Sequence, residues 1–501
     1  MSGGIRVPEN TTVSDALAQN EPRAVWGHFS SILRIPRASR NEKQIIDWIR
    51  SIAAEREWPV RTDRAGNLCV DVPATSGLEK ARKVVLQGHV DMVCEKNRDT
   101  IHDFDRDPIA ARLDGEWVTA SGTTLGADNG IGIAAALAVA TDPQTVHGPL
   151  QLLFTVDEET GLTGAMHIDP SMIEGRILLN LDSEEDGVLC VGCAGGGDVT
   201  IDLPLVTMAP DAGSRAHRLE IRGLHGGHSG IDIDANRGNA IKLATRLLIG
   251  ALNDEIAIEL VAIHGGSKHN AIPREAEALI FVAEGDIDRL RTLVSKMTRD
   301  FRTELRGSDE GLEIHLEPAQ HEGWALEHSS RNRLLHLLMA LPHGVLAMST
   351  TLDDLVETSS CVAVVESSQE SARIIASARS TLDSTLGATL ISLRSIAALA
   401  GAEAKTSDVY PGWQPNLESR LLATMQSVCA DVWGEEPHIG AVHAGLECGL
   451  LGRKIPGLDM ISFGPEIEGA HSPEERVHVP SVQRFWAALC RVLEVIAESD
   501  S

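Results

Sequence analysis

The sequence predicts an α/β domain, with a mostly parallel sheet between helices, that is interrupted by an inserted α+β domain. Three observations lead to this fold class. The chain has 501 residues, which is more than one ordinary hydrophobic core accommodates. Strand and helix patterns alternate over about the first two hundred residues and again near the C-terminus, which is typical of a parallel sheet. Between these parts, alternating strand patterns are interleaved with helices. We therefore expect one domain from residues 1–196 and 409–501, and another from residues 197–408.

The predicted elements of the first domain begin with an amphipathic helix and continue as strand, helix and two strands. Apolar residues recur at helical spacing in the helices and run without interruption in the strands. Ligands of such sheets bind beyond the carboxyl ends of the strands, so polar residues at those ends are candidates for a site. The elements are helices over 42–55 and 130–140 and strands over 83–90, 150–156 and 176–181.

The inserted domain is predicted to have antiparallel strands with helices on one face. Residues 217–224 and 278–285 alternate between apolar and polar, and residues 239–253 have a helical pattern. A strand–helix–strand pattern recurs over 313–400, which predicts an internally duplicated domain. The α/β pattern then returns and ends in a helix over 482–498.

Composition argues against two classes of partner. The net charge of −28 repels phosphate backbones, and an aromatic content of 3% leaves few surfaces for base stacking, so we expect no nucleic-acid partner. The strongly apolar segment at 131–140 is too short to span a bilayer. The N-terminal MSGGIRVPEN lacks the basic and apolar regions of a secretory signal. We therefore expect no membrane partner and a cytoplasmic location.

The eight cysteines are too sparse for a disulfide framework. Cys190 and Cys193 have the spacing of a metal-binding pair, but no second pair accompanies them. We favour the alternative, in which both are ordinary buried thiols.

Polar side chains follow several of the predicted strands. His89 and Asp91 are two apart on an extended segment, so they project to the same side. Taken singly, these residues have ordinary explanations: Asp128 as a helix N-cap, Glu158 in a solvated acidic turn and His471 in a surface loop. The full set is His89, Asp91, Asp128, Asp157, Glu158, Glu159, Asp182 and His471.

Taken together, these residues indicate a metal site. Carboxylates gathered at adjacent strand ends repel one another, and a cation is the simplest way to stabilise them. Two histidines with three carboxylates provide nitrogen and oxygen ligands that suit zinc, manganese or cobalt. Five ligands are too many for one tetrahedral zinc but suit two metals that share a bridging ligand. The sequence therefore predicts a dinuclear hydrolytic site.

Long strings of residues, spread over nearly the whole chain, resemble one known family. They are IPRASRNE from Ile35, LQGHVDMVCEKN, GTTLGADNGIGIA, DEETGLTGA, NLDSEEDG, GGHSGIDI, NAIPREA, YPGWQPN, HAGLECGL and GPEIEGAHSPEERVHV. With them the sequence resembles the aminoacyl-histidine dipeptidases, also called cytosolic non-specific or β-alanyl-histidine dipeptidases. These are co-catalytic zinc peptidases.

The resemblance implies two Zn²⁺ ions per chain, with Mn²⁺ or Co²⁺ as alternatives, and assigns their ligands. Asp128 would bridge the two ions, and a cis peptide before Asn129 would aim its carboxylate. One ion would also bind His89 and Asp182, and the other would also bind Glu159 and His471.

Two neighbouring carboxylates receive other roles from the resemblance. Asp91 would orient His89 from behind the metal site. Glu158 would be the general base that activates a metal-bridging water.

The resemblance makes the inserted domain a lid that also dimerises. His228 would reach the active site of the partner subunit of a homodimer and help to hold the oxyanion, although an ordinary loop histidine is an alternative. Asn270, Arg379 and Gly445 would contact the substrate. Arg379 is the candidate carboxylate anchor, and an ordinary surface arginine is the alternative.

The sequence assigns no single role to two features. Glu447 could hold a substrate amine or support the site from behind. Cys361 and Ala363 stand where the family pattern would have asparagine and glycine, so the substrate contacts of that strand are not carried over.

The leading functional hypothesis is a metal-dependent dipeptidase that acts on dipeptides with a free amino terminus, including Xaa-His. An aminoacylase-type amidohydrolase on the same scaffold is the second hypothesis. A non-catalytic binding protein that retains its metal site is the third, and the presence of Glu158 and all five ligands argues against it.

Overall fold

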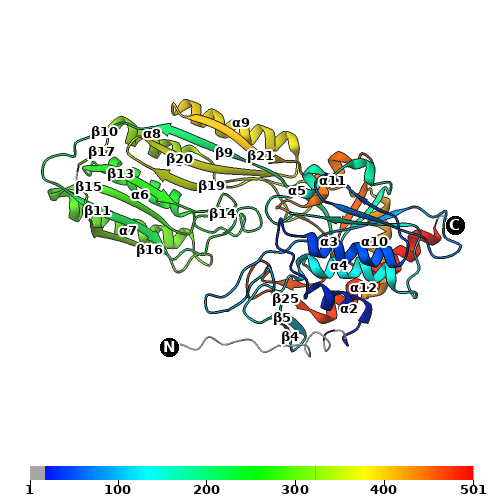
Figure 1. The fold of residues 1–501 in the computed structure, drawn as a ribbon. Helices are drawn as coiled ribbons and strands as arrows, with labels where there is room; N and C mark the ends of the chain where they lie inside the picture. Colours follow the sequence, from blue (N-terminus) through cyan, green and yellow to red (C-terminus); the bar gives the residue numbers. More distant parts are fainter. Residues whose placement is uncertain (1–16, 18, 322, 500–501) are drawn as a thin grey trace, which may run out of the picture. The chain divides into compact units, whose positions relative to one another are not determined.

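The computed structural model describes residue 17 and residues 19–321 and 323–499 (Figure 1). The N-terminal string on which the expectation of no secretory signal rests lies outside the described residues. The chain divides into two compact units. The first unit comprises Met1–Gly192, Pro415–Ala441 and Leu446–Ser501, and the second comprises Cys193–Gln414 and Val442–Gly445.

The sequence-based boundaries, at residues 196 and 408, lie a few residues from these crossings. Strand β9 (Gly195–Pro204) belongs to the sheet of the second unit, so the crossing precedes it. Cys193 forms a β-bridge with Trp413, so Cys193 also belongs to the second unit. The return of residues 442–445 to the second unit has no signal in the sequence.

The first unit is built on an eight-stranded sheet of mixed direction. Its order is β1-β2-β6-β3-β7-β23-β8-β22, and the pairs β6–β3, β3–β7 and β7–β23 are parallel. The strands β3, β6 and β7 are buried along their whole length, as a parallel sheet covered on both faces requires. The strands are β1 (Val60–Thr62), β2 (Leu68–Val72), β3 (Val84–His89), β6 (Leu150–Thr155), β7 (Ile177–Asn180), β8 (Val188–Cys193), β22 (His438–Val442) and β23 (Asp459–Ser462).

Helix α4 (Ala127–Thr141) is apolar on all sides, which is typical of a helix that is covered all round. It packs against α2 and against the strands β3 and β6. The remaining helices are α2 (Arg23–Ile32), α3 (Lys43–Glu55), α5 (Thr163–His167), α10 (Arg420–Trp433), α11 (Glu447–Lys454) and α12 (Val479–Glu498). The helices predicted over 42–55, 130–140 and 482–498 are thus confirmed as α3, α4 and α12.

A small sheet of the first unit holds the loop that carries His471. Its order is β24-β25-β5-β4. Its strands are β4 (Ala111–Asp114), β5 (Trp117–Ala120), β24 (Ile467–Glu468) and β25 (Arg476–His478), so the segment around His471 connects two paired strands.

The second unit is an antiparallel sheet of nine strands with helices packed on it (Figure 1). Its path is β16-β11-β15-β13-β19-β20-β9-β21, and β18 pairs with β19. Besides β9, the strands are β11 (Ser214–Arg222), β13 (Ile258–Gly265), β15 (Ala276–Ala283), β16 (Glu313–Pro318), β18 (Gly344–Met348), β19 (Val356–Ser367), β20 (Ser371–Ser380) and β21 (Glu403–Tyr410). The helices α6 (Ala240–Asn253), α7 (Ile287–Glu304), α8 (His328–Ala340) and α9 (Asp383–Leu399) share one apolar core with the sheet, as expected for an α+β domain.

The two halves of this sheet have the same strand order. In the first half, β11, α6, β13, β15, α7 and β16 follow one another and give the order β16-β11-β15-β13. In the second half, β9, α8, β19, β20, α9 and β21 give β21-β9-β20-β19, and β13 joins β19. The repeat expected over 313–400 covers part of the second half, and duplication of the domain stays a prediction.

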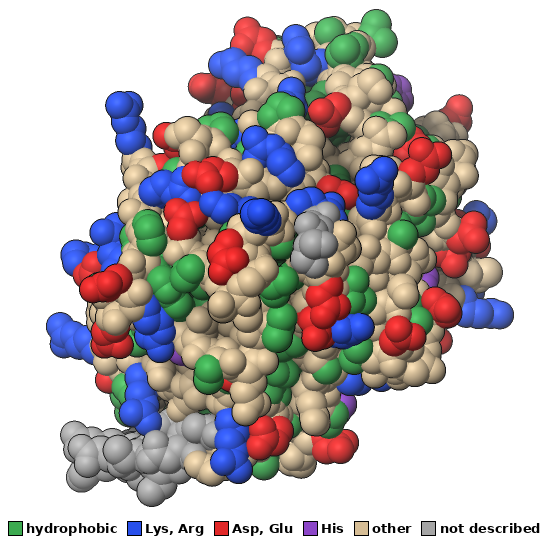
Figure 2. Space-filling model, turned by 90° about the vertical axis from the view of Figure 1, so that its right-hand side faces the viewer, with side chains coloured by type: hydrophobic (Ala, Val, Ile, Leu, Met, Phe, Trp, Pro, Cys, Tyr) green, Lys and Arg blue, Asp and Glu red, His purple; other side chains and the backbone are tan. Residues whose placement is uncertain are grey.

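Cys190 and Cys193 lie in β8, are buried and form no disulfide with any described residue. No helix within the described ranges combines the length and apolar composition that a membrane crossing requires. Acidic and basic side chains are interspersed over the face shown in Figure 2.

Candidate metal centre

His89 and Asp91 do face one site, at the end of β3. Both side chains are buried, and His89 Nδ1 lies 3.4 Å from Asp91 Oδ1. Asp91 also accepts hydrogen bonds from the backbone N–H groups of Glu158, at 3.1 Å, and Glu159, at 3.2 Å. Ser39 Oγ donates to Asp91 Oδ2 at 2.8 Å. Asp91 therefore lies beside His89 and holds the turn that carries the two glutamates by hydrogen bonds.

The carboxylate of Asp128 lies between two histidines from distant parts of the chain. Its Oδ1 is 2.9 Å from His89 Nε2, and its Oδ2 is 3.1 Å from His471 Nε2. His89 Nε2 is also 3.2 Å from Asp182 Oδ1, and His471 Nε2 is 3.0 Å from Glu159 Oε2. The five predicted ligands thus form two groups that share Asp128, each with its ligand atoms within 4.8 Å of one another.

Strand ends and unusual turns bring these side chains together. His89 ends β3, Asp182 follows β7, and the acidic turn 157–159 follows β6, so these groups meet at one edge of parallel strands. Asp157 and His471 both have positive φ angles. The peptide bond between Asp128 and Asn129 is cis, as the resemblance implies.

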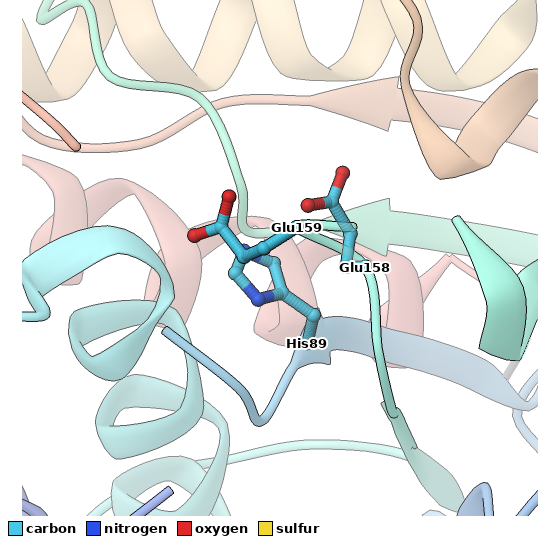
Figure 3. Close-up of side chains that lie close together, drawn as sticks. All are labelled: His89, Glu158 and Glu159. Atoms are coloured by element: carbon cyan, nitrogen blue, oxygen red, sulfur yellow. The ribbon is translucent and has the colours of Figure 1, made fainter. Parts of the chain in front are cut away.

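Glu158 and Glu159 are adjacent in sequence but send their carboxylates in different directions. Figure 3 shows the two carboxylates on separate sides above His89. Each of the three residues offers a ligand atom within 4.8 Å of the others. Glu158 therefore lies beside His89 and Glu159 at the edge of the site. The group around His471 includes Glu159 but not Glu158.

The charges of the site favour a cation. Hydrogen bonds to Asp128 and Glu159 raise the pKa of His471 to about 11. Burial raises the pKa of Asp182 to about 6 and the pKa of Glu158 well above its usual value. Protons are thus held where carboxylates crowd together, and divalent cations would supply the same positive charge. The buried Glu159 Oε1 has no hydrogen-bond partner among the described residues, so the residues present fit such an ion.

Glu447, whose role the sequence leaves open, lies at the N-terminus of α11 and is fully buried. Its Oε2 accepts hydrogen bonds from Gln87 Nε2 and Thr155 Oγ1, both at 2.6 Å. Its Oε1 has no hydrogen-bond partner in the part of the chain that the structure describes, and burial raises the pKa of the carboxyl to about 7.

The second unit assembles most of the predicted substrate residues in one place. His228 Nε2 lies 3.4 Å from an Nη2 of Arg379, and Arg379 Nη1 donates to the Tyr410 hydroxyl at 2.7 Å. A Cβ on Gly445 would lie 2.9 Å from the Tyr410 ring. Asn270 joins the group through its backbone oxygen, which accepts the N–H of Ser229 at 2.8 Å.

Sequence reasoning did not single out Tyr410 or His443 in this group. His443 Nε2 is 2.7 Å from the buried Ser359 Oγ, and burial lowers its pKa to about 4. Cys361 and Ala363 are both buried in β19. Arg37 and Glu475 near the metal centre were also missed, although both stand in the strings that carry the resemblance.

Comparisons with known proteins show which sequences and structures this chain is similar to. A family model described as peptidase family M20/M25/M40 matches residues 85–495. The cytosol non-specific dipeptidase of Escherichia coli K12 is 42% identical, over 96% of this chain and 99% of its own. The crystal structure of aminoacylhistidine dipeptidase from Vibrio alginolyticus is 40% identical, with a TM-score of 0.85 over 96% of this chain and 98% of that one. A tripeptidase from Staphylococcus aureus shares the fold alone, at 16% identity, a TM-score of 0.55, and 96% and 99% coverage.

Proposed function

This chain belongs to the peptidase family M20/M25/M40, and from that premise we propose that it is a metal-dependent dipeptidase. Its substrates are dipeptides with a free amino terminus, including Xaa-His. The observation that carries the proposal is the position of Asp128, whose two oxygens face His89 and His471. The relatives from E. coli and V. alginolyticus, both named as dipeptidases, support this substrate class. The E. coli relative is named a cytosol enzyme, which supports a cytoplasmic location.

The proposed cofactors are two Zn²⁺ ions per chain, with Mn²⁺ or Co²⁺ as alternatives. His89 and Asp182 would hold one ion, His471 and Glu159 the other, and Asp128 both. Such ions lower the pKa of water and polarise a carbonyl when they are bound.

Glu158 is the proposed general base. It is not needed to complete either group around Asp128, and it borders both of them. Its backbone is held by Asp91, which fixes the start of the side chain. Burial among like charges raises its pKa, and a carboxylate of raised pKa is a better proton acceptor.

The second unit supplies the proposed contacts to the substrate. Arg379 would bind the C-terminal carboxylate, since a guanidinium binds a carboxylate through two parallel hydrogen bonds. The Tyr410 hydroxyl fixes Arg379 in place. His228 would donate to the oxyanion of the tetrahedral intermediate. Asn270 and Gly445 are the other proposed contacts. A homodimer is part of the proposal and rests on the family resemblance.

A hydrolysis panel on metal-reconstituted protein tests this function. We expect turnover of Xaa-His dipeptides and β-alanyl-histidine, and none of a tripeptide or an N-acetyl amino acid. Turnover of the N-acetyl amino acid in preference to the dipeptides would instead indicate the aminoacylase-type alternative.

A further inference from the structure

A buried arginine joins two of the turns that carry proposed metal ligands. Arg37 follows α2 and is 2% exposed. Its Nη1 donates to the backbone oxygens of Val90, at 3.1 Å, and Asp91, at 2.5 Å. Its Nη2 donates to the backbone oxygen of Gly126. One guanidinium therefore connects the segment directly after His89 with the turn directly before Asp128.

A buried glutamate holds the same turn from the other side. Glu475 Oε2 accepts the N–H groups of Leu125, at 2.8 Å, and Gly126, at 2.9 Å. Its Oε1 accepts those of Ala127, at 2.7 Å, and Asp128, at 3.3 Å. Glu475 stands in the segment between His471 and β25, and the residue is 2% exposed.

Glycines in the turn leave the space that the guanidinium occupies. A Cβ on Gly126 would lie 2.5 Å from Arg37 Nη2, and a Cβ on Gly130 would lie 2.9 Å from the same atom. The turn GADNG therefore fits around Arg37. A buried charge is tolerated when its hydrogen-bonding groups are satisfied, and these backbone oxygens satisfy both ends of the guanidinium.

We propose that Arg37 and Glu475 form a clamp that keeps the Asp128 carboxylate between His89 and His471 before any cation binds. Arg37 ties the Asp128 turn to the His89 segment, and Glu475 ties the same turn to the His471 loop. Both contact backbone groups and neither reaches the reacting atoms, so they are positioning residues. The proposal deepens the two-cation site of the proposed function and rests on it for its effect on metal binding.

Two conservative substitutions test the clamp. Glu475→Gln keeps the shape of the side chain but turns an NH₂ group toward backbone N–H donors. Arg37→Lys keeps the charge, but a single ammonium replaces the fork that reaches two turns. The matched controls are Glu468→Gln and Arg112→Lys, whose side chains are exposed and form ion pairs with Arg476 and Asp114.

The first measurement uses metal-free protein and needs no assumption about the reaction. Hydrogen–deuterium exchange of the amides of residues 125–128 should be at least about 10-fold faster in Glu475→Gln than in wild type or Glu468→Gln, because the carboxylate that accepts these N–H groups is gone.

The second measurement is a cation titration with Zn²⁺ against a competing chelator. Affinity for at least one of the two ions should fall about 10- to 100-fold in both test variants. The catalytic rate kcat should fall with it, while KM for a dipeptide stays near wild type.

Several outcomes would overturn the clamp. One is wild-type exchange at 125–128 together with wild-type Zn²⁺ affinity in both variants, provided that circular dichroism shows them folded. Another is faster exchange with unchanged Zn²⁺ affinity, because the turn would then be held without any consequence for the ligands. If wild-type protein binds a single Zn²⁺, the two-cation function fails, whereas the exchange and affinity comparison still decides whether the clamp exists.

Discussion

The position of the Asp128 carboxylate leads to a prediction of how many metal ions each chain binds. Its two oxygens face different histidines, and each histidine has a second carboxylate beside it. A single ion would leave one of these groups without a metal ion. We therefore expect two cations per active chain and loss of activity on treatment with a chelator, with recovery when Zn²⁺, Mn²⁺ or Co²⁺ is restored. Metal analysis of the saturated, active protein checks this, and a plateau at one ion per chain would contradict it.

Glu158 offers the sharpest single-residue test of the proposed chemistry. Glu158→Gln preserves the shape of the side chain and removes the proton acceptor. We expect both metals to remain bound while kcat falls by about 10² to 10⁴, the usual contribution of a general base. Glu185→Gln is the matched control, because Glu185 is an exposed acidic residue of the nearby NLDSEEDG segment. Wild-type kcat in a fully metallated Glu158→Gln enzyme would remove Glu158 from this role.

Residue type and position indicated the group of candidate residues, and the family resemblance selected five of them as proposed ligands. Each proposed ligand is a histidine or carboxylate that follows a strand or opens a glycine-rich turn, and such positions converge at the edge of a parallel sheet. The second role of Asp91, in holding the turn of Glu158 and Glu159, depends on the pairing of β3 with β6. No single segment of the sequence predicts that pairing. Arg37 and Glu475 were missed because their partners are backbone groups, which leave no pattern of residue types.

At the scale of elements, the start of α4 shows how a turn serves the site. Gly126 has a φ of 73°, in the left-handed region, and packs against Arg37 and Met92. Gly126→Ala should therefore lower both the stability and the cation affinity of the protein. Gly115→Ala is the matched control, since Gly115 has a φ of 64° and no described residue beyond its chain neighbours would lie within 4 Å of the added Cβ.

Comparison of these two variants separates backbone strain from contact with Arg37. Left-handed backbone costs an alanine about 1–2 kcal/mol, so thermal unfolding should show that loss in both. Zn²⁺ titration should show weaker binding in Gly126→Ala alone. Equal cation affinity in the two variants would mean that the contact between Gly126 and Arg37 does not affect the metal centre.

Elements with strong periodicity were predicted well, and their arrangement was predicted in part. The alternating segments became β11 and β15, and the apolar runs became β3, β6 and β7. The strand order of the second unit was out of reach, because β9 pairs with β20 and β21, which lie far along the chain. Such pairings depend on long-range packing, for which a short segment carries little information.

At the scale of the whole molecule, the same limit explains the path of the chain between its two units. The sequence indicates one inserted domain, because the pattern of strands and helices changes at each of its ends. The short return of residues 442–445 to the second unit has no such change, since it begins at the last residue of β22 and ends just before α11 of the first unit. Ala194 donates its N–H to the oxygen of Val442, and Gly445 packs against Tyr410. These contacts assign the segment to the second unit.

The last prediction concerns which chain supplies His228 to a given substrate. The family resemblance predicts that His228 serves the neighbouring subunit. Within the second unit, however, His228 lies 3.4 Å from Arg379 of its own chain. If Arg379 anchors the carboxylate of a substrate, a histidine beside it reaches that same substrate. We therefore expect His228 and Arg379 of one chain to act together.

Subunit mixing tests this expectation. Arg379→Ala and His228→Ala are each expected to lose most of their activity, since the first removes the carboxylate anchor and the second removes an oxyanion donor, whose loss costs about 10² to 10³ in kcat. If anchor and donor must come from one chain, every chain in a mixed dimer lacks one of them and the mixture stays inactive. If His228 acts with Arg379 of the partner chain, a mixed dimer has one intact site and regains up to half of the activity of a wild-type dimer. Heterodimer formation is verified with differently tagged chains, and recovered activity in such heterodimers would contradict action within one chain.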